Sequence, residues 1–429
     1  MIKSIQRLIR AGLLLLLVGV HASHAAGGDS NGRSVVVWIS IDGVRPDYIE
    51  RTDTPTFDRM RREGAYSLAL APVFPSLTFP NHASQATGVS PGRHGIMMNS
   101  FYDREEQRDY SFPGAPRLLQ AEPIWITAER QGRRTAVFDW VFSYGRHQAT
   151  TPSYHADHYS GNIADRERLQ LLIDTWQLDG AGTEPLQLLM GYMVEPDTVG
   201  HEAGPDSVAV EESVTRMDAK FGAFWQEALE LFKRRMTPDD TLYLLVTSDH
   251  GMSTVHTVVN PYLLSGVSRD EADGEANALL TSGSVAHIYL LQPDTEEARR
   301  SQVDAIVARV SEVDFADVYR REELPAAWGY DHPQRTGDVV ISLHTGYTFN
   351  RGATHLQMPR EQLNSHRGMH GYDVEDNPEM NGIMLVWRYP DLLGGVDLGT
   401  THSLQLHATV AEWLCIPPAP DALADPIRW

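Results

Sequence analysis

The stretch TLYLLVTSDHGM, residues 241–252, is an apolar run that stops abruptly at an acid and an imidazole side by side, Asp249 and His250. A short, continuous apolar run predicts a strand buried on both faces of a parallel sheet. The runs SVVVWISI (34–41) and LQLLMGYMV (186–194) have the same character. We therefore predict three central strands of one sheet.

The segment between the second and third of these runs predicts a long helix. Its sequence, VAVEESVTRMDAKFGAFWQEALELF, places apolar residues near helical spacing, and Asp206 or Ser207 could cap its start. A strand, a helix and a second strand in this order form a crossover unit with parallel strands. The fold class expected from this pattern is α/β.

Acidic residues follow all three predicted strands. The first strand runs into Asp42, the second into Glu195-Pro196-Asp197 and the third into Asp249. Because ligands bind outside the carboxyl ends of parallel strands, these side chains should gather at one rim. Carboxylates this close repel one another unless a cation lies among them. We therefore expect a metal site.

Histidines near the same strand ends favour a transition metal. Asp197 is followed by His201 in a D-x-x-x-H spacing, His250 adjoins Asp249, and His370 stands in RGMHGYD. Carboxylate and imidazole ligands suit zinc, and would also accept cobalt, manganese or iron. Each histidine alone would be interpreted as an ordinary loop or core residue. We assign structural or supporting roles to four others: His82, His94, His256 and His366.

The stretch VFPSLTFPNHASQATG (73–88) predicts a helix that begins near Thr78. Pro80 suits a first helical turn and Gly88 a C-terminal stop. A helix N-terminus offers unpaired N–H groups and a positive dipole, which favour a phosphoryl group or an alkoxide. The alternative is a capping threonine without chemistry.

Composition and charge exclude several classes of protein. The 429-residue chain has a formal net charge of −21, which disfavours binding to nucleic acids and anionic membranes. Cys415 is the only cysteine, so no intrachain disulfide can form, and we expect a buried hydrophobic role for it.

The first 26 residues have the pattern of a secretory signal peptide. Lys3, Arg7 and Arg10 precede an apolar stretch that is too short to span a bilayer, and small residues follow it. Cleavage would take the net charge from −21 to −24 and leave no transmembrane anchor. We therefore expect a periplasmic or secreted protein.

Five motifs in order resemble the nucleotide pyrophosphatase/phosphodiesterase family of the alkaline phosphatase superfamily. They are TFPNH, PGRHGIMMNSFYD, EPDTVGHEAGPDS, SDHGM and MHGYD. The resemblance implies an alkaline-phosphatase-like sandwich with a central, mostly parallel sheet flanked by helices, over residues 34–420. The motifs are absent from 254–362, where strand-like 284–291 and 338–344 flank a helical segment. We interpret 254–362 as a smaller, inserted, cap-like subdomain.

The resemblance also implies a two-zinc site. The implied ligands are Asp197, His201 and His370 for one ion, and Asp42, Asp249, His250 and the Thr78 oxygen for the other.

By the same resemblance, Thr78 attacks phosphorus to form a phosphothreonine intermediate that water cleaves. Asn99 matches the family's phosphate-binding asparagine, and Asn81 is a structural candidate. Phe79 and Tyr192 match aromatics that sandwich a nucleotide base. The implied activity is hydrolysis of phosphodiester or pyrophosphate bonds, with nucleotides giving nucleoside monophosphates.

One loop departs from the family pattern and leaves the substrate open. Many nucleotide-cleaving members have a W-P-G-S-like segment where this chain has residues 139–161. The aromatic cluster there, which could line the pocket or lie in solvent, consists of Tyr154, His155, His158 and Tyr159. The alternatives are a phosphodiesterase for phosphocholine or another lipid headgroup, a phosphonoacetate hydrolase, and a catalytically silent binding protein.

Overall fold

The computed structural model describes residues 32–429 except 162, 180–183, 236 and 270–276. The predicted signal peptide, 1–26, lies outside the described residues. Among the described helices, none is both long and apolar enough to cross a membrane.

Strand β1 (Ser34–Ile41) lies at the centre of the main sheet, between β7 (Leu186–Met193) and β8 (Thr241–Thr247). Both neighbours run parallel to it. Strand β18 (Gly382–Tyr389) continues the sheet beside β8 in the antiparallel direction. The outer strands are β2 (Ala65–Ala71), β19 (Val396–Asp397) and β20 (Thr400–His402) on one side, and β5 (Arg134–Val137) and β6 (Tyr154–His155) on the other. The predicted α/β fold with a mostly parallel central sheet is confirmed.

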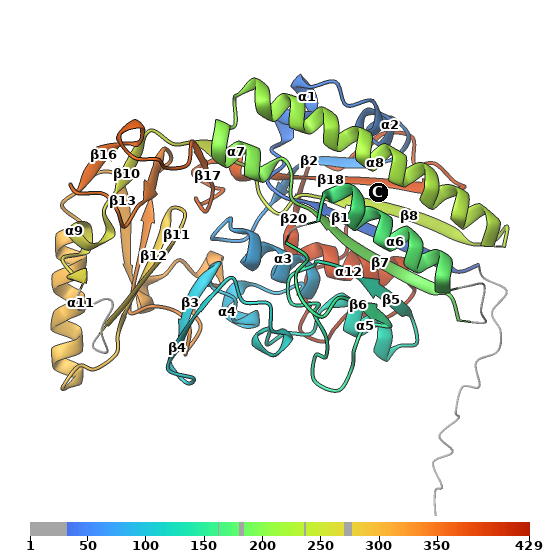
Figure 1. The fold of residues 1–429 in the computed structure, drawn as a ribbon. Helices are drawn as coiled ribbons and strands as arrows, with labels where there is room; N and C mark the ends of the chain where they lie inside the picture. Colours follow the sequence, from blue (N-terminus) through green and yellow to red (C-terminus); the bar gives the residue numbers. More distant parts are fainter. Residues whose placement is uncertain (1–31, 162, 180–183, 236, 270–276) are drawn as a thin grey trace, which may run out of the picture. The chain divides into compact units, whose positions relative to one another are not determined.

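Helices cover both faces of this sheet, because β1 sends alternate side chains into two cores. On one face, Val37 and Ile39 belong to a core shared with α2 (Pro55–Glu63), α6 (Asp165–Asp179) and α8 (Val208–Arg235). On the other, Val36 and Trp38 belong to a core shared with α3 (Thr78–Thr87), α5 (Ile124–Arg130) and α12 (Leu406–Trp413). Figure 1 shows α6 and α8 across one side of the sheet and α5 and α12 across the other.

Helix α8 confirms the predicted crossover between β7 and β8. It begins at Val208, and the Ser207 hydroxyl accepts a hydrogen bond from the Val210 N–H at 3.3 Å. Ser207 rather than Asp206 therefore caps the helix. The Asp206 carboxylate instead accepts a hydrogen bond from Arg45 at 2.7 Å.

Residues 254–362 form two small sheets of their own, drawn on the left of Figure 1. One contains β11 (Asn277–Ser282), β12 (Val285–Leu290), β14 (Val339–Leu343) and β13 (Ala316–Arg320). The other contains β15 (Tyr347–Phe349), β10 (Thr257–Val259) and β16 (Gln357–Pro359). With α9 (Pro261–Ser265) and α11 (Glu296–Val310), these strands enclose a separate apolar core. The expected strands and helix of this segment are therefore present.

The ends of this segment are held together by a short ladder. Strand β9 (Ser253–Thr254) pairs with β17 (Gly368–Met369) in the antiparallel direction. A further contact joins the segment to the hairpin of β3 (Ser100–Asp103) and β4 (Arg108–Ser111), where Arg335 and Asp103 form a buried ion pair at 2.8 Å.

The remaining short helical segments connect these elements. They are α1 (Pro46–Arg51), α4 (Pro91–His94), α7 (Asp197–Ala203), and the 3-10 turns η1 (Pro116–Leu118), η2 (Arg321–Glu323), η3 (Ala326–Trp328), η4 (Arg360–Gln362), η5 (Pro378–Met380) and η6 (Ser403–Gln405).

The expected burial of Cys415 is wrong, because its side chain is exposed. Helix α12 ends in a Schellman motif, in which Ile416 N–H bonds to Ala411 C=O and Cys415 N–H to Glu412 C=O, both at 3.0 Å. This motif places Cys415 in the left-handed region, with φ of 54°. The turn points its thiol away from the core that the neighbouring Leu414 and Ile416 enter.

Candidate active site

The predicted strand ends meet at one rim of the main sheet. Asp42 directly follows β1, Asp197 begins α7 after β7, and Asp249 and His250 follow β8. His370 follows β17, which returns the chain from the inserted segment. The rim therefore gathers carboxylates and imidazoles from four separate parts of the sequence.

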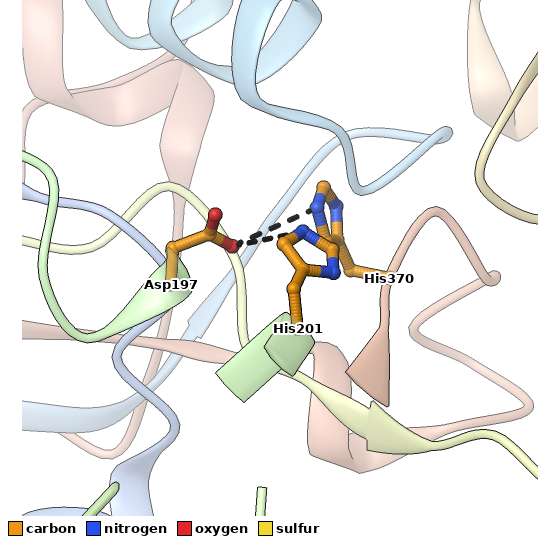
Figure 2. Close-up of side chains that lie close together, drawn as sticks. All are labelled: Asp197, His201 and His370. Carbon is orange, nitrogen blue, oxygen red and sulfur yellow. Dashed lines mark ion pairs between the residues drawn. The ribbon is translucent and has the colours of Figure 1, made fainter. Parts of the chain in front are cut away.

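Asp197, His201 and His370 form one group that could hold a metal ion, shown in Figure 2. The Asp197 Oδ1 atom lies 3.4 Å from His201 Nε2 and 3.8 Å from His370 Nε2. Candidate ligand atoms of the three residues all lie within 4.8 Å of one another. This first ligand set has the composition expected from the sequence.

A second group surrounds His250 Nε2. This atom lies 3.3 Å from Asp42 Oδ1 and 3.2 Å from Asp249 Oδ2. Asp197 also contributes, because its ligand atom lies within 4.8 Å of those of Asp42 and His250. We call Asp42, Asp249 and His250 the second ligand set, and Asp197 lies between the two sets.

All three histidines present the same nitrogen to the rim. His201 Nδ1 lies 2.8 Å from the Gly368 carbonyl and His370 Nδ1 lies 2.8 Å from the Ser76 carbonyl. His250 Nδ1 lies 2.9 Å from the Gly251 carbonyl. A carbonyl can only accept, so each Nδ1 donates and each Nε2 keeps its lone pair for the rim. This is the usual arrangement of metal-binding histidines.

Burial keeps the imidazoles of His250 and His370 neutral. It lowers the pKa of His250 to about 4, and it lowers the pKa of His370 well below the usual value, with His250 and His201 adding to the effect. The rings of these two residues stack with centroids 3.6 Å apart. Neutral imidazole is the form that binds metals.

The carboxylates offer unpaired oxygens to the same space. Asp42 Oδ1, Asp197 Oδ1 and Asp249 Oδ2 are buried and lack a hydrogen-bond partner in the described part of the chain. Burial, followed by the charges of Asp249 and Asp197, raises the pKa of Asp42 well above its usual value. Buried anions of this kind are costly without a cation. The residues present therefore fit divalent metal ions.

Thr78 lies at the start of α3, next to the second ligand set. Its Oγ1 atom lies 3.2 Å from His250 Nε2. Thr78 is the first residue of the helix, and Leu77 occupies the cap position. The alternative, in which Thr78 caps the helix without taking part in chemistry, is therefore wrong about the cap, because Leu77 occupies it.

Asn99 faces the same helix start. Its side-chain oxygen accepts a hydrogen bond from the Phe79 N–H at 3.1 Å. The amide NH₂ consequently remains available as a donor beside Thr78. Asn81, in contrast, accepts from Val73 N–H at 2.8 Å and donates to the Pro75 carbonyl at 3.0 Å. It shapes the loop before the helix, as expected of a structural residue.

Comparison with known proteins places this arrangement in a family. Residues 36–373 match the model described as type I phosphodiesterase / nucleotide pyrophosphatase. The chain belongs to this family.

Two curated relatives and one solved structure illustrate the similarity. An uncharacterised pyrophosphatase/phosphodiesterase of Schizosaccharomyces pombe is 29% identical over 81% of this chain and 70% of its own length. Bis(5'-adenosyl)-triphosphatase ENPP4 of Bos taurus is 26% identical over 95% of this chain and 84% of its own. An inactive variant of murine ectonucleotide pyrophosphatase/phosphodiesterase 5, solved with AMP, superimposes with a TM-score of 0.75. It is 24% identical and covers 90% of this chain and 96% of its own.

This phosphodiesterase is thus an enzyme, a nucleotide pyrophosphatase/phosphodiesterase-like hydrolase, with the alkaline-phosphatase-like fold. The family hydrolyses phosphodiester and pyrophosphate bonds and is metal-dependent, which agrees with the candidate ligand sets.

Two supporting contacts of the phosphodiesterase site were not predicted from the sequence. The Tyr192 hydroxyl donates to Asp42 Oδ2, and the Gly43 N–H donates to Asp249 Oδ1 at 3.2 Å. Gly43 has φ of 67°, and a Cβ there would lie 2.9 Å from the Asp197 Cβ. Only glycine allows this close approach, and its place directly after a strand-end aspartate was the available signal.

Ser76 joins the loop before Thr78 to the segment of His370. Besides its carbonyl bond to His370, its hydroxyl donates to the Tyr372 carbonyl at 2.7 Å and accepts from Gly371 N–H at 3.0 Å. A serine two residues before Thr78 carried no sequence signal, because its partners lie about 300 residues away along the chain.

The two predicted base-stacking aromatics have different surroundings. The Phe79 ring is half-buried and contacts Phe112, with centroids 5.6 Å apart. The Tyr192 ring is buried in β7 and lies 5.2 Å from His82. Its hydroxyl donates a hydrogen bond to Asp42, so Tyr192 supports a candidate metal ligand. Stacking of its ring on a base stays a prediction.

The divergent loop contributes one aromatic near the rim. Tyr159 lies 6.5 Å from Tyr192 by ring centroids and stacks with the Arg168 guanidinium at 4.8 Å. Tyr154, in contrast, donates to Asp179 at the end of α6, and it forms β6 with His155 at the sheet edge. Of the predicted cluster, Tyr159 therefore lies near the site, and Tyr154 and His155 lie at the sheet edge.

Proposed function

We propose that this protein hydrolyses nucleotide diesters and pyrophosphates to nucleoside monophosphates, through a covalent intermediate on Thr78 and with two zinc ions. The observation that carries the proposal is the position of Thr78 Oγ1, 3.2 Å from His250 Nε2, beside three carboxylates that each have a buried, unpaired oxygen. A nucleophile at a helix start next to a metal-ligand cluster is suited to phosphoryl transfer.

The chain's residues would share the work as follows. Asp197, His201 and His370 would hold one ion, and Asp42, Asp249, His250 and the Thr78 oxygen the other. When bound, the ions lower the pKa of the nucleophile and neutralise charge on the substrate and leaving group.

Thr78 forms the bond to phosphorus while the bond to the leaving oxygen breaks, and water later cleaves the phosphothreonine. The helix start holds the Thr78 oxygen in place, and the N–H groups of the first turn have no acceptor within the helix. The Asn99 amide donates to a non-bridging phosphate oxygen. Loss of one such donor costs about 3 kcal/mol in the barrier, so Asn99→Ala should lower kcat by about a hundredfold.

Metal analysis tests the ligand assignment. Purified enzyme reconstituted with zinc should contain two ions per chain by elemental analysis, and Asp249→Ala should contain one. His407→Gln is the matched control, because His407 is equally buried but bonds to Ala86 and Ala419 instead of the rim. Zinc-free enzyme with full activity after chelation would disprove the metal-dependent mechanism.

Substrate comparison tests the nucleotide assignment. The murine relative was solved with AMP, and the bovine one is named for a dinucleotide substrate. We expect kcat/KM for ATP to exceed that for a phosphocholine ester in the same preparation. Phe79→Ala should raise KM for nucleotides more than for a bis(p-nitrophenyl) diester, since base stacking is worth about 1 to 3 kcal/mol. Preference for the choline ester would move the enzyme to lipid headgroups and leave the Thr78 mechanism standing.

A further inference from the structure

A cavity of about 1050 Å³ lies beside the first ligand set and has no role in the mechanism described so far. His201 and Glu202 of α7 line it. The other lining residues come from the end of the inserted segment, including Arg351 and Arg360, and from the residues that lead to β17. Pockets of about 300 to 1,000 Å³ hold small-molecule ligands, so this cavity has room for a nucleotide-sized group.

The residues that lead to β17 connect this cavity directly to His201. The Arg367 N–H donates to the His201 carbonyl at 2.7 Å, and the Gly368 carbonyl accepts from His201 Nδ1 at 2.8 Å. The His366 ring lies 4.7 Å from the His201 ring by centroids. A group bound in the cavity would therefore lie next to the first ligand set.

Positive charge gathers in this cavity, although the whole chain has a net charge of −21. Three arginines line it, Arg351, Arg360 and Arg367, against two glutamates, Glu202 and Glu361.

Two of these arginines have partners within the protein. Arg360 pairs with Glu361 at 2.6 Å, while Arg351 donates to the Leu279 carbonyl. Arg367 is exposed and forms no ion pair with any residue in the described ranges. Its guanidinium is thus available for an anion, and guanidinium groups bind phosphate with particular strength.

The direction of the reaction leads toward this cavity. In phosphoryl transfer the attacking and leaving oxygens lie roughly in line with phosphorus. Thr78 contacts the second ligand set through His250, so the leaving oxygen would point toward the first set and His201. Whatever the leaving group carries beyond that oxygen would enter the cavity.

We infer that this cavity binds the phosphates of the leaving group and that Arg367 is a specificity-determining residue for them. The inference rests on the proposed function and adds to it a residue of this chain that would bind the leaving group. The role of Arg367 applies to substrates whose leaving group bears a further phosphate, such as ATP and diadenosine triphosphate.

The first test compares leaving groups with and without a further phosphate. Arg367→Ala should raise KM for ATP and for diadenosine triphosphate about tenfold, the loss expected of one charge-assisted hydrogen bond. It should leave KM for p-nitrophenyl thymidine monophosphate unchanged, because that leaving group carries no phosphate. Arg367→Lys should recover part of the loss.

Arg428→Ala is the matched control, since it removes another exposed arginine, which pairs with Glu412 near the C-terminus. An effect of Arg367→Ala on ATP alone would assign the cavity to a terminal phosphate, and one on diadenosine triphosphate alone to a bridging one. Equal effects on all three substrates, or none on any, would overturn the inference.

The second test measures binding without turnover. Zinc-loaded Thr78→Ala enzyme should bind ATP more tightly than AMP in calorimetry, and adding Arg367→Ala should weaken ATP binding about tenfold while AMP binding stays the same. Equal weakening of both would overturn the role of Arg367. Failure of the wild type to hydrolyse any of the three substrates would contradict the proposed function instead, and the binding comparison would still decide the inference.

Discussion

The two ligand sets differ in how deeply they lie. In the second set the side chains of Asp249 and His250 are 0% exposed, whereas in the first the Asp197 side chain is 14% and the His201 side chain 17% exposed. The second set follows two neighbouring central strands, β1 and β8, while the first joins a short helix to the segment after β17. The buried set adjoins the nucleophile, and the more open set adjoins the cavity. In the proposed mechanism, the more deeply buried set would position the attack and the more accessible set would face the leaving group.

Replacing Thr78, beside the second set, should produce the largest loss of activity. Thr78→Ala removes the oxygen beside the second set and should lower kcat by several powers of ten, while Thr78→Ser should keep partial activity. Steady-state kinetics measure both, and rapid quenching should trap phosphothreonine in the wild type. Full activity of Thr78→Ala would show that another group attacks phosphorus.

Metal removal should separate the two sets. A chelator titration should release zinc in two phases, and the first phase should come from the more exposed first set. His201→Ala should eliminate that phase and leave the slower one, as measured by a zinc-sensitive dye. A single phase in both proteins would contradict a difference between the two sets. The fully chelated enzyme should unfold at a lower temperature, because the buried carboxylates then repel one another.

A smaller effect is expected where a residue only supports a ligand. Tyr192→Phe removes the hydroxyl that donates to Asp42 and should weaken zinc binding about 10- to 100-fold, as is usual for groups that orient ligands. The ring remains, so nucleotide KM at saturating zinc should change little. An increase in KM without a change in zinc affinity would show that the Tyr192 hydroxyl contacts the nucleotide instead of supporting Asp42.

The smallest effect concerns a buried histidine outside the rim. His407 Nδ1 donates to the Ala86 carbonyl at 2.7 Å and its Nε2 accepts from Ala419 N–H at 2.9 Å, so burial and these contacts leave no place for a second proton. Burial lowers its pKa from 6.5 to about 4. Below pH 6.5 the unfolded chain therefore binds a proton that the folded chain does not, and stability falls with falling pH.

Between pH 6.5 and about pH 4, His407 should lower the free energy of unfolding by about 1.4 kcal/mol for each unit that the pH falls. Urea unfolding of wild type and His407→Gln at pH 6.5 and pH 5 measures it, and the variant should depend less on pH. Identical dependence would show that His407 is already neutral in the unfolded chain or protonated in the fold.

The sequence predicted the central strands and the gathering of carboxylates and imidazoles at one rim, for a physical reason. Buried parallel strands are continuous apolar runs, so their ends are visible, and charged residues at those ends stand out. The boundaries of β1 match the prediction, and those of β7 and β8 differ by one residue or so.

Contacts between distant segments could not be predicted in this way. The bond between Tyr192 and Asp42, the position of Asp197 between both ligand sets and the closeness of Arg367 to His201 all depend on how separate segments pack. The predicted burial of Cys415 was wrong because a Schellman turn reverses the direction of a side chain without changing the local composition.

The ladder between β9 and β17 has an evolutionary consequence. Gly368 pairs with Thr254 and Met369 with Ser253, so the two ends of the inserted segment are fastened to each other within a few residues of His250 and His370. Insertions, deletions or wholesale replacement between these strands can alter the cavity wall without changing the spacing of the ligands. Selection could thus exchange the segment that lines the cavity while the candidate ligands of the rim are inherited unchanged.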